Sequence, residues 1–383
     1  MIIYCRSCLF PNTKPDLHFN EDGECNACTN YKNRNQINWN ERLNQLKDIL
    51  KKYKSTKSAY WDCIIPVSGG KDSTYQVIKM LELGMNPLCV TATTCDLSEI
   101  GRCNIDNIKS LGVDCIEISP NQVVRKKLNR IGLTHVGDIS WPEHAGIFTI
   151  PIKIAVQFNV PLIIWGENPQ NEYGGPAAAT KTNVLDRRWL EEFGGLLGLR
   201  VSDLPVIEEI KTNDLVFYQY PEQIDLDHIG VTGLFLGYFI PWDGNSNAVI
   251  AQEHGFKTID TIVEGSVVNY ENLDNYQTGI HDYFKYLKFG FGRATDLLSM
   301  SIRRGKITRE DALQLVKVHD GIFPSTYLGK SLSDILEPLN INISEFEKIC
   351  DRFTNKKIFK KNDDGSLKKD DSGRPLKINY DNL

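Results

Sequence analysis

Short apolar runs alternate with segments of helical periodicity between positions 61 and 165. The runs have the length and composition of buried strands, and they are residues 63–67, 88–92, 115–118 and 162–165. Between them, residues 73–83 and 99–111 have helical spacing, and each segment is followed by a glycine of the kind that ends helices. The alternation predicts an α/β fold, a doubly wound parallel sheet with helices on both faces. Ligands of such sheets bind at the carboxyl ends of the strands.

The flanking segments have other patterns. Residues 38–54 repeat apolar positions at helical spacing, so we expect an amphipathic helix there. Residues 166–232 are rich in glycine and have no long periodic segment, which indicates a substrate-facing insertion. The apolar run at 234–240 predicts a late strand, and residues 281–320 are predicted to be mainly helical.

These patterns divide the chain into five parts. They are a four-cysteine module at 1–36, a linker helix at 37–58, a main domain at 59–300 with its insertion at about 166–232, a helical C-terminal region at 301–354, and a polar tail or small hairpin at 355–383.

Composition and charge exclude several classes of protein. The chain has 383 residues, of which 41% are hydrophobic and 24% charged, as in globular proteins of two or three domains. Its formal net charge of −5 provides no electrostatic footprint for nucleic acid or for an anionic membrane surface. Residues 1–6 lack a basic segment followed by an apolar one, and no apolar run approaches membrane-spanning length. We therefore expect a cytoplasmic protein.

One segment has the pattern of a phosphate-binding loop. It joins the first predicted strand to the following helix and reads Ser68, Gly69, Gly70, Lys71, Asp72 and Ser73. Glycines let the backbone approach a phosphate closely, and a helix N-terminus favours an anion. All six residues are therefore predicted to bind ATP, with Asp72 orienting Mg²⁺ or the phosphate chain. A glycine turn without a ligand is the alternative.

The loop is not a Walker A motif, because that pattern requires glycine at position 65 and serine or threonine at position 72. Its Ser-Gly-Gly-x-Asp-Ser form closely resembles the PP-loop ATPase superfamily. The resemblance implies attack at the α-phosphate, transfer of AMP to a substrate oxygen and release of pyrophosphate. It also implies that Thr91 and Ala92, at the end of the second strand, hold the adenine base, and that Gly166 lies at the nucleotide. An ordinary strand end is the alternative at Thr91 and Ala92.

The ten cysteines are distributed unevenly along the chain. Cys5 and Cys8 form one pair with two residues between them, Cys25 and Cys28 form another, and sixteen residues separate the pairs. Two such turns complete a tetrahedral site, so the four thiolates are predicted to bind a structural Zn²⁺. An iron–sulfur cluster and a pair of redox disulfides are the alternatives. Four thiolates leave no open coordination position, so we expect no catalytic role for the metal.

Three further segments carry a more specific resemblance. They are residues 166–175, 281–293 and 302–312. Together with the cysteine pairs and the loop, they resemble the N-acetyl sugar amidotransferases of the WbpG and PseA type, over most of the chain. That family converts an acetamido group of a bacterial surface-polysaccharide sugar, of the O-antigen or pseudaminic and legionaminic type, into an acetamidino group. The resemblance implies that a separate glutaminase subunit, with a cyclase-like partner, supplies the ammonia.

The implied reaction requires cations for the phosphates and polar groups for the sugar. An amide carbonyl is a poor electrophile, and AMP transfer to its oxygen gives an imidate from which the adenylate leaves when ammonia attacks. The predicted catalytic residues are Asp72, Lys288 and Arg293. The predicted sugar-binding residues are Glu167, Asn168, Glu172, Tyr173, Asp243, His281 and Lys285. Ordinary structural roles, such as the polar face of a helix, are the alternative for each.

Other functions compete with this interpretation. A glutaminase needs a nucleophilic cysteine at the N-terminus or in a Gly-x-Cys-x-Gly turn, and the sequence has neither, so we expect no glutamine hydrolysis by this chain alone. A PP-loop tRNA-modifying enzyme of the thiolase or lysidine-forming type would need RNA contacts, against which the acidic balance argues. A non-catalytic nucleotide-binding scaffold subunit is the remaining alternative, against which the intact Asp72 and Ser73 argue.

Overall fold

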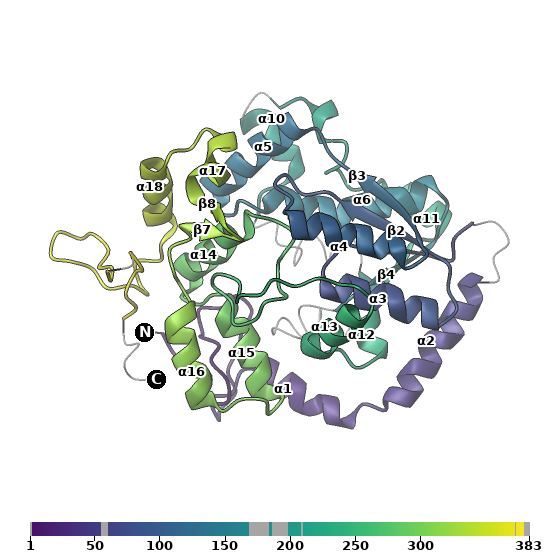
Figure 1. The fold of residues 1–383 in the computed structure, drawn as a ribbon, viewed down its shortest axis with the longest axis horizontal. Helices are drawn as coiled ribbons and strands as arrows, with labels where there is room; N and C mark the ends of the chain where they lie inside the picture. Colours follow the sequence, from purple (N-terminus) through teal and green to yellow (C-terminus); the bar gives the residue numbers. More distant parts are fainter. Residues whose placement is uncertain are drawn as a thin grey trace.

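A mainly parallel sheet forms the centre of the molecule (Figure 1). The computed structural model describes residues 2–54, 60–167, 184–185, 198–207, 210–371 and 373–378. The strand order in the sheet is β3-β2-β1-β4-β6-β5. The strands are β1 (Cys63–Pro66), β2 (Pro87–Ala92), β3 (Asp114–Ile118), β4 (Leu162–Trp165), β5 (Val184–Leu185) and β6 (Thr232–Phe235). All neighbours pair in parallel except β5, which runs antiparallel to β6.

Helices cover both faces of this sheet. Successive strand residues point to opposite faces, so Cys63 and Ile65 belong to one apolar core while Ile64 belongs to another. The first core includes residues of α2 (Trp39–Lys54), α3 (Lys71–Glu82), α4 (Glu99–Ser110) and α12 (Leu236–Phe239). The second includes residues of α6 (Trp141–Gln157) and α11 (Gln223–Ile229). The predicted α/β class and doubly wound sheet are therefore confirmed.

The predicted strand at 234–240 is wrong in its second half. Strand β6 ends at Phe235, and α12 begins at the next residue. Its neighbour β4 is only four residues long, so the ladder has no partner beyond Phe235. Gly237 instead donates its backbone N–H to the carbonyl of Gly166 at 3.0 Å. The apolar side chains that follow are buried by helix packing against α2 rather than by a sheet.

The rest of the chain is mainly helical. Near the sheet lie α5 (Gln122–Ile131), η2 (Gly132–Val136), η3 (Val201–Asp203), α10 (Leu204–Ile207), η4 (Thr212–Leu215) and α13 (Gly244–Glu253). The C-terminal part contains α14 (Thr278–Phe289), α15 (Arg293–Arg303), α16 (Arg309–His319), β7 (Thr326–Tyr327), β8 (Lys330–Ser331), α17 (Leu332–Leu336), η5 (Glu337–Leu339) and α18 (Ile343–Phe353). The largely helical character predicted for residues 281–320 is confirmed.

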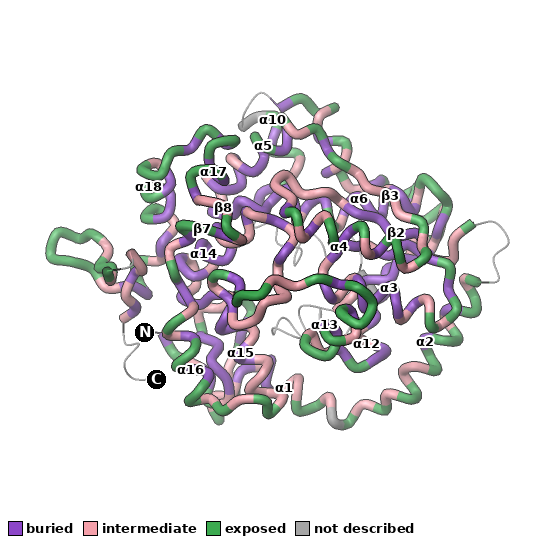
Figure 2. Tube along the Cα trace, in the orientation of Figure 1, coloured by how far each residue is buried: buried purple, intermediate pink, exposed green. Residues whose placement is uncertain are grey.

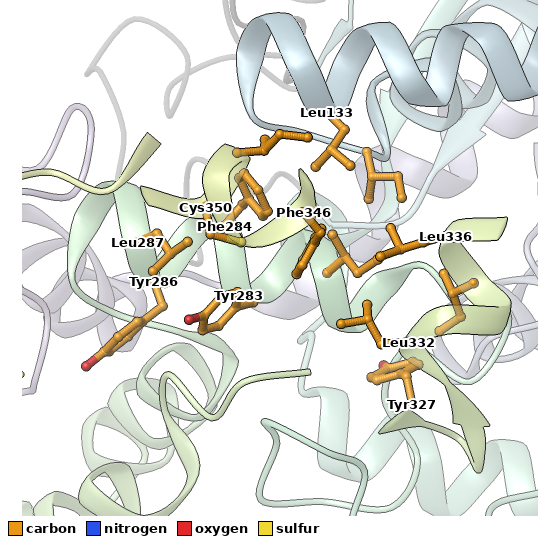
Figure 3. Packing of buried hydrophobic residues seen from close by; sticks show 14 of the residues in the cluster. Leu133, Tyr283, Phe284, Tyr286, Leu287, Tyr327, Leu332, Leu336, Phe346 and Cys350 are labelled. Carbon is orange, nitrogen blue, oxygen red and sulfur yellow. The ribbon is translucent and has the colours of Figure 1, made fainter. Parts of the chain in front are cut away.

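The C-terminal part has an apolar core of its own, which reaches back to the sheet domain. Figure 3 shows Phe284 and Leu287 of α14 packed near Phe346 of α18, with Leu133 of η2 closing the cluster from the other side. Beyond α18 the chain doubles back through isolated bridges between Phe359 and Lys377 and between residues 361 and 367. Residues on both sides of position 300 therefore share one core.

The N-terminal segment connects the two parts. The short helix α1 (Asn26–Asn33) contains Cys28, η1 (Arg34–Gln36) follows it, and α2 then extends to the sheet (Figure 1). In Figure 2, α2 is mostly exposed or half-buried, and only Leu46 and Leu50 are buried in it. In the part of the chain that the structure describes, no helix is both long enough and apolar enough to cross a lipid bilayer.

Candidate active site

The loop predicted from the sequence lies where the strand order of the sheet reverses. Strand β1 has β2 on one side and β4 on the other, so the chain moves outward in opposite directions from this point. Open α/β sheets bind ligands in the crevice at such a reversal. Residues 68–70 follow β1 and lead into α3, while Gly166 and Glu167 follow β4. The fold therefore brings two predicted segments together at one edge.

The backbone of the loop requires glycine at one position. Gly69 has φ +85°, and a Cβ added there would lie 2.8 Å from the backbone nitrogen of Ile105. Gly70 has an extended conformation and immediately precedes α3. The hydroxyls of Ser73 and Thr74 both donate to the Gly70 carbonyl at 3.0 Å. These bonds fix the first turn of α3 with its N-terminus at the loop, a position that favours an anion.

A polar cavity of about 120 Å³ lies over this turn. We call it the loop cavity; it is lined by residues 68–73, 101, 104, 256 and 270–274. Lys71 is only 5% exposed, and its Nζ lies 2.6 Å from both Asp72 Oδ2 and Glu271 Oε1. Burial lowers the pKa of Lys71, but the two carboxylates outweigh it and raise that pKa, so the ammonium stays charged. Asn247 of α13 donates to Asp72 Oδ1 at 2.8 Å.

A second cavity, of about 280 Å³, opens at the strand ends. We call it the strand-end cavity, and it shares Ser68, Asp72, Ser73 and Asp274 with the loop cavity. The predicted residues Thr91, Ala92, Gly166 and Glu167 all line it. Its other walls are mainly apolar and come from Val67, Val90, Leu97, Ile105, Ile147, Phe148, Pro151, Trp165, Phe235 and Trp242. A mostly apolar hollow with a few polar groups is typical of small-molecule sites.

Several polar groups of described residues that line the strand-end cavity are buried without a hydrogen-bond partner. They include the indole N–H groups of Trp165 and Trp242 and the hydroxyl of Thr94. Buried donors without a partner are costly, so they indicate a place for a polar ligand or water.

Sequence reasoning missed residues 270–274, which line the loop cavity. Asp274 lines both cavities, and burial raises its pKa from 3.8 to about 6. The only signal in the sequence was a run of polar residues before a helix, which resembles many surface loops. The contact between Lys71 and Glu271 spans two hundred positions, and only the tertiary structure establishes it.

The predicted cations of α14 and α15 lie outside both cavities. Arg293 forms a two-pronged ion pair with Asp282, at 3.2 and 3.0 Å. Lys285 pairs with Asp296. Lys288 donates to the Val136 carbonyl at 3.4 Å, and burial lowers its pKa. With its amide turned to satisfy the guanidinium, Asn272 accepts a hydrogen bond from Arg293 Nε at 3.1 Å, which links Arg293 to the wall of the loop cavity.

The predicted sugar-binding residues are distributed over several places. Asp243 caps the start of α13 and pairs with Arg304 at 3.1 Å and Lys306 at 2.7 Å. Burial raises the pKa of Asp243, but these cations outweigh it and lower that pKa. His281 lies 2.7 Å from Asp138, away from both cavities. Asn168, Glu172 and Tyr173 lie outside the described residues. The roles given to all these residues stay predictions.

The four paired cysteines converge on one point. All four are buried, and their sulfur atoms all lie within 4.8 Å of one another. The Cys5 and Cys28 sulfurs are 3.8 Å apart, and those of Cys8 and Cys25 are 3.7 Å apart. Zinc bound to four sulfurs at about 2.3 Å separates them by about 3.8 Å. The cluster therefore has the dimensions of a tetrahedral zinc site.

The C-terminal part of the chain is similar to a known family. Residues 264–370 match the family model of the WbpG-like LPS biosynthesis protein, C-terminal domain. No curated protein matches the chain. Similar solved structures include NMN synthetase from Francisella tularensis, at 14% identity and a TM-score of 0.25, with 59% of this chain and 98% of that chain covered.

The matched region includes two of the three segments on which the resemblance was based, residues 281–293 and 302–312. It also includes residues 270–274, which line the loop cavity. The phosphate loop and the family-specific region thus meet at the same place. Residues 264–370 are therefore similar to the C-terminal domain of WbpG-like LPS biosynthesis proteins, and part of this region lines the cavity over the loop.

Proposed function

We propose that this protein is an ATP-dependent amidotransferase that converts the acetamido group of an N-acetyl sugar into an acetamidino group. The observation that carries the proposal is that residues 270–274, from the WbpG-like region, complete the cavity over the PP-loop. A nucleotide bound at the loop would thus lie against the part of the chain that is specific to this family.

We expect the loop cavity to hold the phosphates of the nucleotide and the strand-end cavity to hold its base. The loop cavity offers the backbone of residues 68–70, the start of α3 and the hydroxyls of Ser68 and Ser73 to the phosphates. The strand-end cavity offers apolar and aromatic walls, among them Phe148, to the base.

Magnesium has suitable ligands beside the loop. Asp72, Glu271 and Asp274 bring carboxylates to the loop cavity, and Mg²⁺ in nucleotide sites typically takes one or two carboxylates with phosphate oxygens. The ion would supply charge neutralisation to the phosphates. Lys71 is held between Asp72 and Glu271, so it offsets their repulsion of the anionic nucleotide.

The proposed reaction has two steps. The amide oxygen of the sugar attacks the α-phosphorus, and the bond from that phosphorus to pyrophosphate breaks. Ammonia then adds to the carbon of the adenylated imidate, the carbon–oxygen bond to AMP breaks, and a proton is released. The amide oxygen therefore leaves in AMP, and the acetamido C=O becomes C=NH.

This route predicts where an isotope label appears. Purified protein is incubated with ATP, Mg²⁺, ammonium chloride and a panel of free, nucleotide-linked and nine-carbon N-acetyl sugars carrying ¹⁸O in the acetamido carbonyl. We expect one sugar to lose about 1 Da relative to its unlabelled form as oxygen is replaced by NH, and the ¹⁸O to appear in AMP. Label released in phosphate or water, or formation of AMP only with tRNA, would contradict the proposal. ATP binding without any AMP would favour a scaffold.

We further propose that the ammonia comes from a separate glutaminase subunit with a cyclase-like partner. None of the ten cysteines lies in a Gly-x-Cys-x-Gly turn, in which one class of glutaminases carries its nucleophile. With glutamine in place of ammonium chloride, the purified chain is expected to give no product. Glutamine-dependent turnover by the chain alone would refute this part of the proposal.

A further inference from the structure

A second cluster of metal-type ligands lies apart from the cysteine module. Asp138 follows the turn after η2, His144 lies in the first turn of α6, and His281 lies in the first turn of α14. One ligand atom from each residue lies within 4.8 Å of the others. Among the described residues, this triad and the four cysteines are the two groups with such convergence. The triad joins segments separated by more than a hundred positions.

The distances within the triad are close to those of a coordination sphere. Asp138 Oδ1 lies 2.7 Å from His281 Nδ1, and Asp138 Oδ2 lies 3.5 Å from His144 Nδ1. The two imidazole rings are 5.2 Å apart and nearly perpendicular. Ligands bound at about 2.1 Å to one ion are about 3.0 to 3.4 Å apart. Small side-chain movements would therefore place all three around a common ion.

The carboxylate is held rigidly in place. Asp138 is buried, and its Oδ1 accepts a hydrogen bond from the Ser140 backbone at 2.9 Å. Its own N–H donates to the Gly132 carbonyl at 3.0 Å. Gly137 has φ +64° and lies against Phe353, where an added Cβ would be 2.8 Å from the ring. The buried carboxylate is therefore a fixed ligand for an ion. The two imidazoles are only half-buried, so an ion can reach the triad from solvent.

Neighbouring charges do not complete or block the triad. Glu143, next to His144, is already engaged by Arg125 at 3.3 Å and by Asn129 at 2.9 Å. The ammonium of Lys288 acts on Asp138 by its charge, but it donates to the Val136 carbonyl. The ligand set is therefore two imidazoles and one carboxylate.

We propose that Asp138, His144 and His281 bind one divalent transition-metal ion. Imidazole and carboxylate ligands in this ratio suit zinc, cobalt and other first-row metals, and three protein ligands leave a coordination position open. None of the three residues lines either cavity, but Ile147 and Phe148, one helical turn from His144 in α6, line the strand-end cavity. The proposal goes beyond the amidotransferase function and does not depend on it.

Metal binding is measured on the full chain with zinc kept in the cysteine module. Calorimetric titration with Co²⁺ is expected to show one equivalent bound. The absorption spectrum of the Co²⁺-loaded protein should show the weak visible bands of nitrogen and oxygen ligands and no thiolate charge-transfer band. His144→Ala and His281→Ala should each weaken binding at least tenfold. The control is His135→Ala, an exposed histidine outside the triad, which should bind Co²⁺ as the wild type does.

The alternative is that Asp138 only accepts hydrogen bonds from the two imidazoles. This alternative is supported if the wild type binds no metal ion other than the one in the cysteine module. It is also supported if both histidine variants bind Co²⁺ as tightly as the control. If a variant does not fold, proton NMR of the wild type decides. Bound Co²⁺ should shift or broaden two of the seven histidine ring signals, and equal effects on all of them, or on none, would overturn the proposal.

Discussion

Gly69 is the residue at which the loop is most sensitive to substitution. Its positive φ and its 2.8 Å approach to Ile105 leave no room for a side chain. We expect Gly69→Ala to cost about 1 to 2 kcal/mol in backbone strain alone and to weaken ATP binding at least tenfold, as measured by calorimetry. Gly112→Ala is the matched control, because Gly112 has φ +86° and no atom within 4 Å of an added Cβ. Equal loss of affinity in both variants would show that the contact with Ile105 is irrelevant.

Asp274 should make stability depend on pH. Its pKa is raised from 3.8 to about 6 by burial, so the unfolded chain loses this proton first as the pH rises. The charged carboxylate therefore lowers the free energy of unfolding above pH 6 and has no such effect below about pH 4. Because the side chain lines two cavities, solvent screens part of this effect. We therefore expect the charge to lower the free energy of unfolding by only about 1 to 2 kcal/mol.

Asp274→Asn removes that charge. Without nucleotide, the variant is expected to be more stable than the wild type at pH 8 and about equally stable at pH 4, in denaturant unfolding at both pH values. With Mg²⁺ and ATP the order should reverse at pH 8, because the variant lacks a carboxylate beside the phosphates. A stability difference that does not change with pH would exclude the proposed titration.

At the scale of elements, the cysteine module contacts two C-terminal helices. Arg309 of α16 donates to the carbonyls of Cys8 at 3.1 Å and Cys5 at 3.4 Å, and Ser299 of α15 accepts from the Leu9 backbone at 3.3 Å. Cys8→Ser is therefore expected to expose residues 2–36 and the start of α16 to hydrogen exchange, while the strands stay protected. Cys103→Ser, at an exposed cysteine outside the module, should change neither.

Element boundaries were predictable where local signals agree. The strands at 63–67, 88–92 and 162–165 were found within about one residue, because apolar runs of strand length are bounded by loop residues. Gly84 and Gly112, with φ of +75° and +86°, follow the helices where expected. The run at 234–240 failed because its apolar residues fit a strand and a buried helix equally well, and the length of β4 decided between them.

At the scale of the whole molecule, one apolar cluster joins parts that lie on both sides of position 300. Phe284 is 1% exposed and lies in this cluster with Leu133 and Phe346 (Figure 3). We expect Phe284→Ala to lower the free energy of unfolding by about 3 to 5 kcal/mol, and the chain to unfold in one transition by both fluorescence and circular dichroism. Phe158→Ala, at a ring that is 41% exposed, should cost much less. Two separate transitions would show that the C-terminal region unfolds independently.

The sequence by itself determined the elements whose chemistry is local. The six-residue loop, the two cysteine pairs and the alternation of strands and helices each depend on neighbours within a few positions, so a linear pattern reveals them. The same holds for the segments 281–293 and 302–312, which lie within the region that matches the WbpG-like C-terminal domain.

Only the tertiary structure decided which distant residues meet. Charged and polar side chains are common on loops and helix faces, and nothing local distinguishes Glu271 and Asp274, which line the loop cavity, from Lys285, which pairs with Asp296 elsewhere. The convergence of His281 with Asp138 and His144 likewise results from the packing of two segments that lie more than a hundred positions apart. Contacts of this kind are set by how helices close over the sheet and not by spacing along the chain.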